Sequence, residues 1–171
     1  IHSYRNVEHE HRARELVLEE HPDCFVSISS DVIREYREYE RTLTTCLNSG
    51  LMPRLSSYIG RLESALTPST QLFVMKSSGG VSGAAELVER PVGAVLSGPA
   101  AGVIEAASAS LNAGYDHVLT LDMGGTSTDI ALVTGGKPDL LSEGRIDVYD
   151  LKVPMIDMTA VGAGGGSIAW L

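Results

Sequence analysis

The chain has 171 residues, 43% of them hydrophobic, which is enough for one domain with a packed core and argues against wholesale disorder. Its formal net charge of -9 argues against binding to nucleic acid or to an anionic membrane, because both need a basic patch. No segment approaches the roughly 18 apolar residues of a membrane span, and the sequence shows no signal-peptide pattern. Cys24 and Cys46 match no metal or redox spacing, so we expect buried thiols in a reducing compartment and a cytoplasmic protein.

Residues 1–70 are predicted to form a helical segment with one short strand, packed on a lobe made by residues 71–171. The charged stretch 5–20 is typical of a helix. The apolar sequence CFVSIS at 24–29 indicates the short strand. Ser29-Ser30-Asp31 then offers an N-cap for a helix that begins at Val32.

A long helix is predicted over residues 38–66, with Pro53 as the place for a bend. Its apolar residues keep near-helical spacing, namely Leu43, Leu47, Leu51, Leu55, Ile59, Leu62 and Leu66. The charged cluster from Arg37 to Thr42 has two interpretations. It is either a solvated helix face, which is the usual role of a charge run, or an Arg–Glu network that reaches a cleft or docks another lobe.

The rest of the chain alternates helices and strands before a run of strands. The predicted elements are a strand at 72–75, a turn at 77–80, a helix at 84–89, a strand at 93–96, a helix at 100–113, and strands at 117–122, 128–134 and 145–153. This order indicates an α/β fold with a mixed sheet and flanking helices, as one structural domain overall. The small residues of helix 100–113 favour close packing on a sheet. This helix is also a candidate to line a nucleotide cleft with its N-terminus, or to form the hinge-side face between two lobes.

The most informative stretch is 119–133, an apolar strand that ends in Asp122, a Gly124-Gly125 turn, the three hydroxyl residues 126–128, and a second apolar strand. The two glycines permit positive φ and leave no Cβ between the turn and an approaching phosphate. Backbone amides and hydroxyls at such a turn form an anion-binding nest. A carboxylate would repel phosphate, so Asp122 favours a Mg²⁺ ion held between them.

The alternative interpretation of 119–133 is a plain hairpin whose Gly-Gly turn needs positive φ. Two other glycine-containing stretches, at 135–137 and 162–167, give weaker signals for nucleotide binding. A P-loop is excluded, because Gly135-Gly136-Lys137 runs into Pro138. The glycines of the sequence GAGGGS at 162–167 half-resemble a dinucleotide fingerprint. They are otherwise a backbone loop near the same phosphates or near adenosine, or a tight packing turn.

Several motifs occur in a fixed order: Ser29-Ser30, REYERT at 37–42, SGG at 78–80, LSGPAAG at 96–102, DMGGTSTD at 122–129, VPMID at 153–157 and GAGGGSIAW at 162–170. This order resembles the hydantoinase A/5-oxoprolinase family, a branch of the actin, sugar-kinase and heat-shock-chaperone ATPase superfamily. The resemblance covers nearly the whole chain from about residue 23 and rests on several independent motifs.

The resemblance implies a ribonuclease-H-like (actin-like) lobe beside an ATP cleft, and ATP-driven opening of a cyclic amide such as a hydantoin or 5-oxoproline. Related members are ATP-dependent ketone carboxylases. In either scheme ATP phosphorylates an amide or enol oxygen. Asp122 is then the Mg²⁺ ligand, and Asp129 supports the turn or is a second carboxylate on the metal side. The ATP-binding residues are Gly124, Gly125, Thr126, Ser127, Thr128, Gly162, Gly164, Gly165 and Gly166.

Two departures from the family pattern bear on function. Lys76-Ser77-Ser78 stands where Gln-Ser-Asn is expected, which puts a substrate contact at that turn in doubt. Members also carry a first Asp-x-Gly-Gly-Thr loop in another lobe, whereas this chain has one copy. The chain begins at Ile1 and stops after a glycine-rich run, so we expect a piece of a longer polypeptide that is inactive alone. The competing hypothesis is a non-catalytic actin-like module that docks other lobes, a partner subunit or a second copy.

Overall fold

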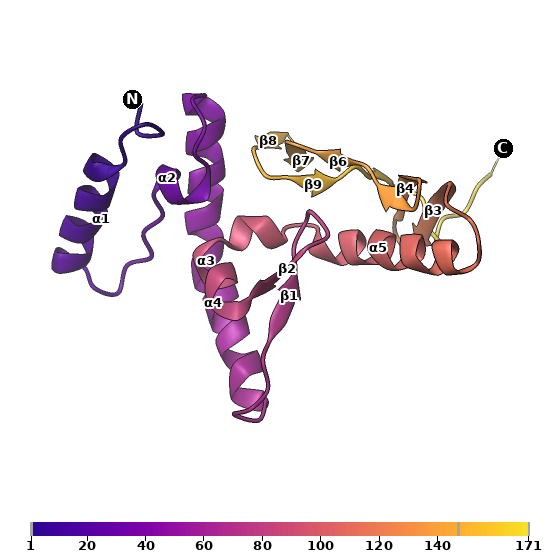
Figure 1. Cartoon of the computed structure of the whole chain (residues 1–171), viewed down its shortest axis with the longest axis horizontal. Helices are drawn as coiled ribbons and strands as arrows, with labels where there is room; N and C mark the ends of the chain where they lie inside the picture. The colour runs from indigo at the N-terminus through magenta and orange to yellow at the C-terminus, as the bar shows by residue number, and fades with distance from the viewer. Residues whose placement is uncertain (1, 147, 171) are drawn as a thin grey trace. The chain divides into compact units, whose positions relative to one another are not determined.

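The computed structural model describes residues 2–146 and 148–170 (Figure 1). The chain divides into two compact units that alternate along the sequence. Unit 1 comprises Ile1–Val74, Val81–Val95 and Glu143–Val153, and unit 2 comprises Met75–Gly80, Leu96–Ser142 and Pro154–Leu171. The boundary near residue 70 that the sequence suggests stays a prediction.

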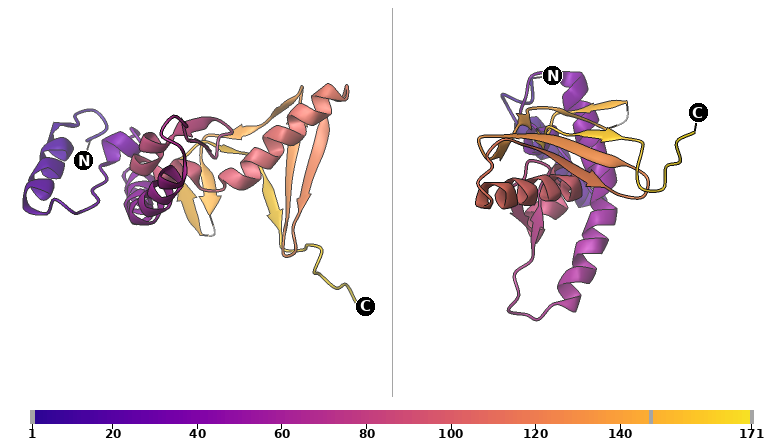
Figure 2. Two further views of the ribbon diagram at one scale, coloured as in Figure 1. Left: turned by 90° about the horizontal axis from the view of Figure 1, so that it is seen from below. Right: turned by 90° about the vertical axis from the view of Figure 1, so that its right-hand side faces the viewer.

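Unit 1 is mainly helical, and its longest element is one continuous helix (Figure 2). The elements of this unit are α1 (Glu8–Glu20), α2 (Ser29–Val32), α3 (Glu38–Ala65), β2 (Val81–Gly83), α4 (Ala84–Glu89), the 3-10 helix η1 (Pro91–Ala94), β7 (Gly144–Ile146) and β8 (Tyr149–Leu151). Strand β1 (Phe73–Met75) pairs with β2. The long helix predicted at 38–66 is therefore confirmed as α3, with Pro53 inside it.

Four local predictions in this part of the chain are wrong. Residues 24–28 form no strand, because no neighbouring strand pairs with them. Ser29 lies inside α2 and not before it, and no side chain caps that helix from the preceding residue. The strand expected at 93–96 is replaced by η1, which begins at Pro91. Cys24 and Cys46 are exposed, so they are not buried thiols.

A buried polar residue holds together three separate stretches of unit 1. Asn48 of α3 is fully buried, and its amide nitrogen donates to the Ser27 hydroxyl and to the carbonyl of Glu89, both at 2.9 Å. Its amide oxygen accepts the N–H of Val92 at 3.2 Å. The apolar core nearby is built on Ile59 of α3 and Leu87 of α4.

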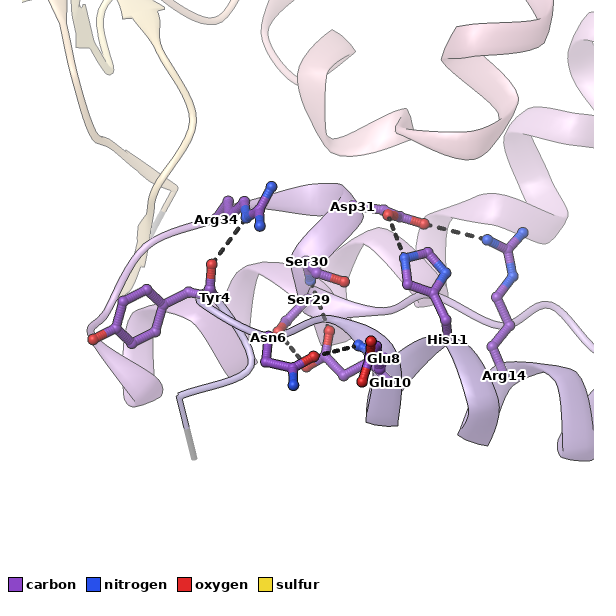
Figure 3. A network of polar contacts seen from close by, with 10 residues as sticks. All are labelled: Tyr4, Asn6, Glu8, Glu10, His11, Arg14, Ser29, Ser30, Asp31 and Arg34. Carbon is purple, nitrogen blue, oxygen red and sulfur yellow. Dashed lines mark hydrogen bonds and ion pairs between the residues drawn. The ribbon is translucent and has the colours of Figure 1, made fainter.

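Helix α1 has no buried residue and is attached to α2 by polar contacts (Figure 3). The Glu10 carboxylate accepts the Ser29 hydroxyl at 2.6 Å and the Ser30 N–H at 2.8 Å. Partial burial raises the pKa of Glu10, but these hydrogen bonds outweigh it and lower the pKa to about 2. Arg14 forms an ion pair with Asp31 at 3.3 Å.

Unit 2 places one helix against an antiparallel sheet. Its elements are α5 (Ser97–Asn112), β3 (Val118–Met123), β4 (Thr128–Thr134), β5 (Lys137–Pro138), β6 (Leu140–Leu141), β9 (Met155–Ile156) and β10 (Thr159–Val161). The sheet has the order β10–β4–β3, and β5 also pairs with β4. The α/β class is confirmed. The mixed sheet is wrong for these strands, because each of these pairings is antiparallel.

The core of unit 2 lies between α5 and one face of the sheet. Ala100, Val103 and Ala107 of α5 pack against Ala131 and Val133 of β4. Close packing of the alanine-rich helix is therefore confirmed, and the small side chains explain it because they let the helix approach the strands. The opposite face of the hairpin is exposed and apolar, and carries Leu119, Leu121, Met123 and Leu132.

No helix in the described part of the chain is both long and apolar enough to cross a membrane.

Candidate functional site

The β3–β4 hairpin ends in an accessible bend that carries most of the sequence-predicted site residues (Figure 2). The Gly124 N–H donates to the Ser127 carbonyl at 2.9 Å and closes the bend. Gly124, Gly125 and Thr126 are exposed, and Ser127 is half-buried. The predicted strand–turn–strand is confirmed, and the turn faces solvent.

The backbone reason given for the two glycines is wrong. Neither Gly124 nor Gly125 has a positive φ. The positive φ values in this hairpin region belong to Gly135 and Gly136, in the turn between β4 and β5. A second segment of backbone approaches this bend, but a Cβ on Gly124 would meet only the Ser127 carbonyl oxygen at an ordinary 3.6 Å, and a Cβ on Gly125 would have nothing within 4 Å.

That second segment is the glycine-rich stretch 162–167. The N–H of Gly165 donates to the Gly124 carbonyl at 2.9 Å, and the N–H of Gly166 donates to the Gly125 carbonyl at 3.0 Å. A Cβ on Gly164 would lie 2.6 Å from the Gly124 oxygen, a distance that real Cβ atoms do not show. Residue 164 must therefore be glycine for the two loops to meet. The structure brings the two predicted glycine motifs together.

Thr128 fastens the two loops at the start of β4. Its side chain is 4% exposed, and its hydroxyl donates to the Ala163 carbonyl at 2.6 Å. On the other side of the glycine-rich loop, the Ser167 hydroxyl accepts the Gly164 N–H at 3.0 Å. The loop is thus braced at both ends. The sequence analysis missed this contact, since nothing in a chain pattern links position 128 to position 163.

Two carboxylates lie opposite each other beside the bend. Asp122 of β3 and Asp129 of β4 are cross-strand partners. Like charges in this arrangement are unfavourable unless a cation lies between them. Among the described residues, neither carboxylate has an ion-pair partner. The Asp122 Oδ2 atom points at α5, 3.4 Å from where a Cβ on Gly102 would stand.

A cavity of about 370 Å³ opens between α5 and β3 at these carboxylates. Its wall on the helix side includes the small residues Gly102, Ala106 and Ser110. The cavity is lined by Pro99, Gly102, Val103, Ala106, Ser110, residues 118–122 and Asp129.

The bend also presents backbone donors. In the part of the chain that the structure describes, the N–H groups of Gly125, Thr126 and Ser127 have no hydrogen-bond acceptor. Within residues 2–146 and 148–170 no group of three or more His, Cys, Asp or Glu side chains is placed to hold a metal. A cation here would have one or two carboxylate ligands and would complete its shell with water or phosphate oxygens, as Mg²⁺ commonly does. The donor set fits that ion.

The turn at 77–80, where the sequence departs from the family pattern, packs inside unit 2. Gly79 has φ +81°, and a Cβ there would lie 2.8 Å from Ile104 of α5. Ser77 is buried, and its carbonyl accepts the Ile156 N–H at 2.9 Å. Glycine at 79 is therefore favoured by the positive φ, and a larger residue would also have to displace the end of the Ile104 side chain.

A family model described as hydantoinase/oxoprolinase matches residues 41–171. This chain belongs to the hydantoinase/oxoprolinase family. The resemblance that the order of motifs predicted is thereby confirmed.

Individual family members are similar over the whole chain. The α subunit of caprolactamase from Pseudomonas jessenii is 39% identical over 172 residues, which cover 99% of this chain and 25% of that protein. 5-Oxoprolinase 1 from Arabidopsis thaliana is 33% identical over 175 residues, which cover 98% of this chain and 13% of that protein. This chain therefore spans a quarter or less of the length of these two relatives.

Two solved structures of related enzymes have folds similar to that of this chain. The crystal structure of ATP-dependent caprolactamase from Pseudomonas jessenii superposes with a TM-score of 0.83 at 38% identity, over 99% of this chain and 25% of that one. The nucleotide-free structure of acetone carboxylase, described as ATP-dependent, superposes with a TM-score of 0.75 at 32% identity, over 96% of this chain and 24% of that one.

Proposed function

We propose that this chain supplies one phosphate-binding loop of an ATP-dependent enzyme that opens a cyclic amide such as a hydantoin or 5-oxoproline. In this proposal the chain is part of a longer polypeptide and unit 2 belongs to a ribonuclease-H-like, actin-like lobe. The observation that carries the proposal is the bend after β3, where accessible amides lie next to two facing carboxylates. Family membership and two structural neighbours described as ATP-dependent support it.

Asp122 is the proposed Mg²⁺ ligand and Asp129 the second carboxylate. A shared cation would remove the repulsion between these facing side chains. Mg²⁺ needs only one or two protein carboxylates when phosphate oxygens and water complete its octahedron, so the pair is sufficient.

The amides of Gly125, Thr126 and Ser127 are the proposed donors to phosphate oxygens. Such a nest of N–H groups favours an anion without a lysine. The hydroxyl of Thr128 is already engaged with Ala163, so we assign Thr128 to positioning the glycine-rich loop. The further residues proposed to surround the nucleotide are Gly124, Gly162, Gly164, Gly165 and Gly166.

Bound Mg-ATP would supply a phosphoryl group that turns the amide oxygen into a leaving group. The residues of this chain would contribute orientation and charge neutralisation, which account for most of the catalysis of phosphoryl transfer. The carboxylates would hold the cation next to the bend, and the amides would orient the phosphate toward the acceptor oxygen.

A ketone carboxylase is the second candidate, favoured by the superposition with acetone carboxylase. The same loop would then serve phosphorylation of an enol oxygen. A third candidate is a non-catalytic module that docks a partner subunit, since one relative is itself named a subunit. Bicarbonate-dependent product formation separates the carboxylase from the amide hydrolase, and absence of any nucleotide turnover identifies the module.

The test is Asp122→Asn in the full-length polypeptide that contains this chain. We expect ATP-dependent ring opening to fall by about 100-fold or more, as when one preorganised electrostatic contact is removed. Asp116→Asn is the matched control, because Asp116 is an exposed residue of the α5–β3 connection. Near-normal turnover of Asp122→Asn would refute the metal role, and an equal loss in Asp116→Asn would show that the effect is not specific to the site.

A further inference from the structure

Unit 1 contains a buried arginine that the proposed phosphate site does not use. Arg41, in the first turns of α3, is 5% exposed. Its Nη1 donates to the Glu35 carbonyl at 2.6 Å, and its guanidinium carbon lies 5.7 Å from the centre of the Tyr4 ring. Among the described residues no carboxylate forms an ion pair with it. A guanidinium has five N–H donors, so most of its donors have no protein acceptor here.

An arginine of this kind is unusual, because buried charges are paired in folded proteins. The carbonyl and the aromatic ring compensate part of the desolvation of Arg41, but neither carries a negative charge. The local structure therefore has a place for an anion that the described residues do not provide.

Arg41 lines a cavity of about 480 Å³ between α1, residues 26–29 and the start of α3. This volume is in the range of small-molecule sites. The lining combines apolar side chains with hydroxyls, and comprises Ser3, Glu10, Ala13, Arg14, Val17, residues 26–29, Glu38, Arg41, Thr42, Thr45 and Cys46.

The other charges at the cavity already have partners or face solvent. Glu10 is held by the hydroxyl and amide groups of Ser29 and Ser30, and Arg14 is paired with Asp31 (Figure 3). Glu38 is exposed. Arg41 therefore differs from the other ionised groups of the cavity in that its charge is buried without a countercharge.

We propose that this cavity binds a small organic carboxylate, with the carboxylate on the Arg41 guanidinium and the apolar part against Val17, Val26 and Ile28. A planar guanidinium matches a carboxylate in a bidentate pair. The apolar lining favours an organic acid over a bare inorganic anion. This site is independent of the phosphate loop, which lies in the other unit.

The two cysteines allow a direct test. Cys46 is exposed and lines the cavity, whereas Cys24 is exposed and does not line it. The rate of thiol modification is measured in Cys24→Ser and Cys46→Ser, each with one thiol left, at constant ionic strength. The probes are butyrate, neutral butyramide and inorganic phosphate. We expect butyrate to slow modification of Cys46 with a midpoint of about 1–10 mM, typical of a ligand with so few atoms, and to leave Cys24 unaffected.

Substitutions identify the residue responsible. We expect Arg41→Met to abolish the protection by butyrate, and Arg41→Lys, which keeps the charge without the planar fork, to weaken it severalfold. Arg14→Gln is the matched control, because Arg14 lines the same cavity but is paired, and protection persists in it. Circular dichroism checks the fold of each variant, and Arg41→Lys keeps the test decisive if Arg41→Met does not fold.

Three results would overturn the proposal. The first is equal reactivity of Cys46 with and without butyrate. The second is equal protection by butyramide, which has no charge, or protection by phosphate alone. The third is loss of protection in Arg14→Gln to the same degree as in the Arg41 variants, which would indicate a general electrostatic effect.

Discussion

Replacing Gly164 by alanine should separate the two loops of the candidate phosphate site. The added Cβ would lie 2.6 Å from the Gly124 oxygen, and ordinary contact begins at 3.4 Å, so the loop must retreat by about 0.8 Å. The hydrogen bonds from Gly165 and Gly166, 2.9 and 3.0 Å long, would then exceed 3.5 Å. Two bonds of about 1 kcal/mol each correspond to an increase of about 30-fold in local opening.

Amide hydrogen exchange of Gly165 and Gly166, measured by NMR in the whole chain, reports this opening. Gly162→Ala is the matched control, because nothing lies within 4 Å of a Cβ at that position. In Gly165→Ala the new Cβ would be 3.8 Å from the Gly124 oxygen, an ordinary contact, so little change is expected there. Equal exchange rates in Gly164→Ala and Gly162→Ala would refute the steric reasoning.

Two further predictions concern Thr128 and Glu10. Thr128→Val should raise exchange at Gly164 to Gly166 by about fivefold, through loss of one hydrogen bond of about 1 kcal/mol. Thr128→Ser should keep the exchange rates of the unaltered chain, and identical behaviour of the two variants would contradict a role for the hydroxyl. The pKa of Glu10 is lowered from 4.5 to about 2 in the folded chain, so its stabilisation is complete above pH 4.5 and is lost as the pH falls through 2. Because Glu10 is partly exposed, we expect Glu10→Gln to lower the unfolding free energy by about 1 kcal/mol at pH 7 and by almost nothing near pH 2. Urea titrations at the two pH values measure this difference. A loss of stability that does not change with pH would exclude the carboxylate as its source.

Elements with a strong periodic signal could be predicted from the sequence. The apolar spacing of α3 and the two strands around 124–127 are local patterns, and the structure places them where the patterns do. The stretch 24–29 has the composition of a strand but no partner strand, and this depends on residues elsewhere in the chain.

In the candidate site, too, local features could be predicted from the sequence and long-range contacts could not. Glycine at 164 is visible in the sequence, but its reason is the approach of two backbones separated by about forty residues. The positive φ predicted at 124 and 125 is wrong, and in this region it occurs instead at Gly135 and Gly136, in the next turn. The Thr128 contact and the buried charge of Arg41 are likewise long-range consequences of folding, and periodicity carries no signal for them.

The outer side of the β3–β4 hairpin has a practical consequence. The leucine and methionine side chains there are 53 to 63% exposed and form an apolar surface strip on the face opposite α5. Strips of this kind bind hydrophobic dyes, adhere to chromatography resins and attract chaperones during expression. Purification of the isolated chain should therefore include mild detergent, and glutamate or lysine at Leu119 and Leu132 should improve its solution behaviour without touching the helix-facing core.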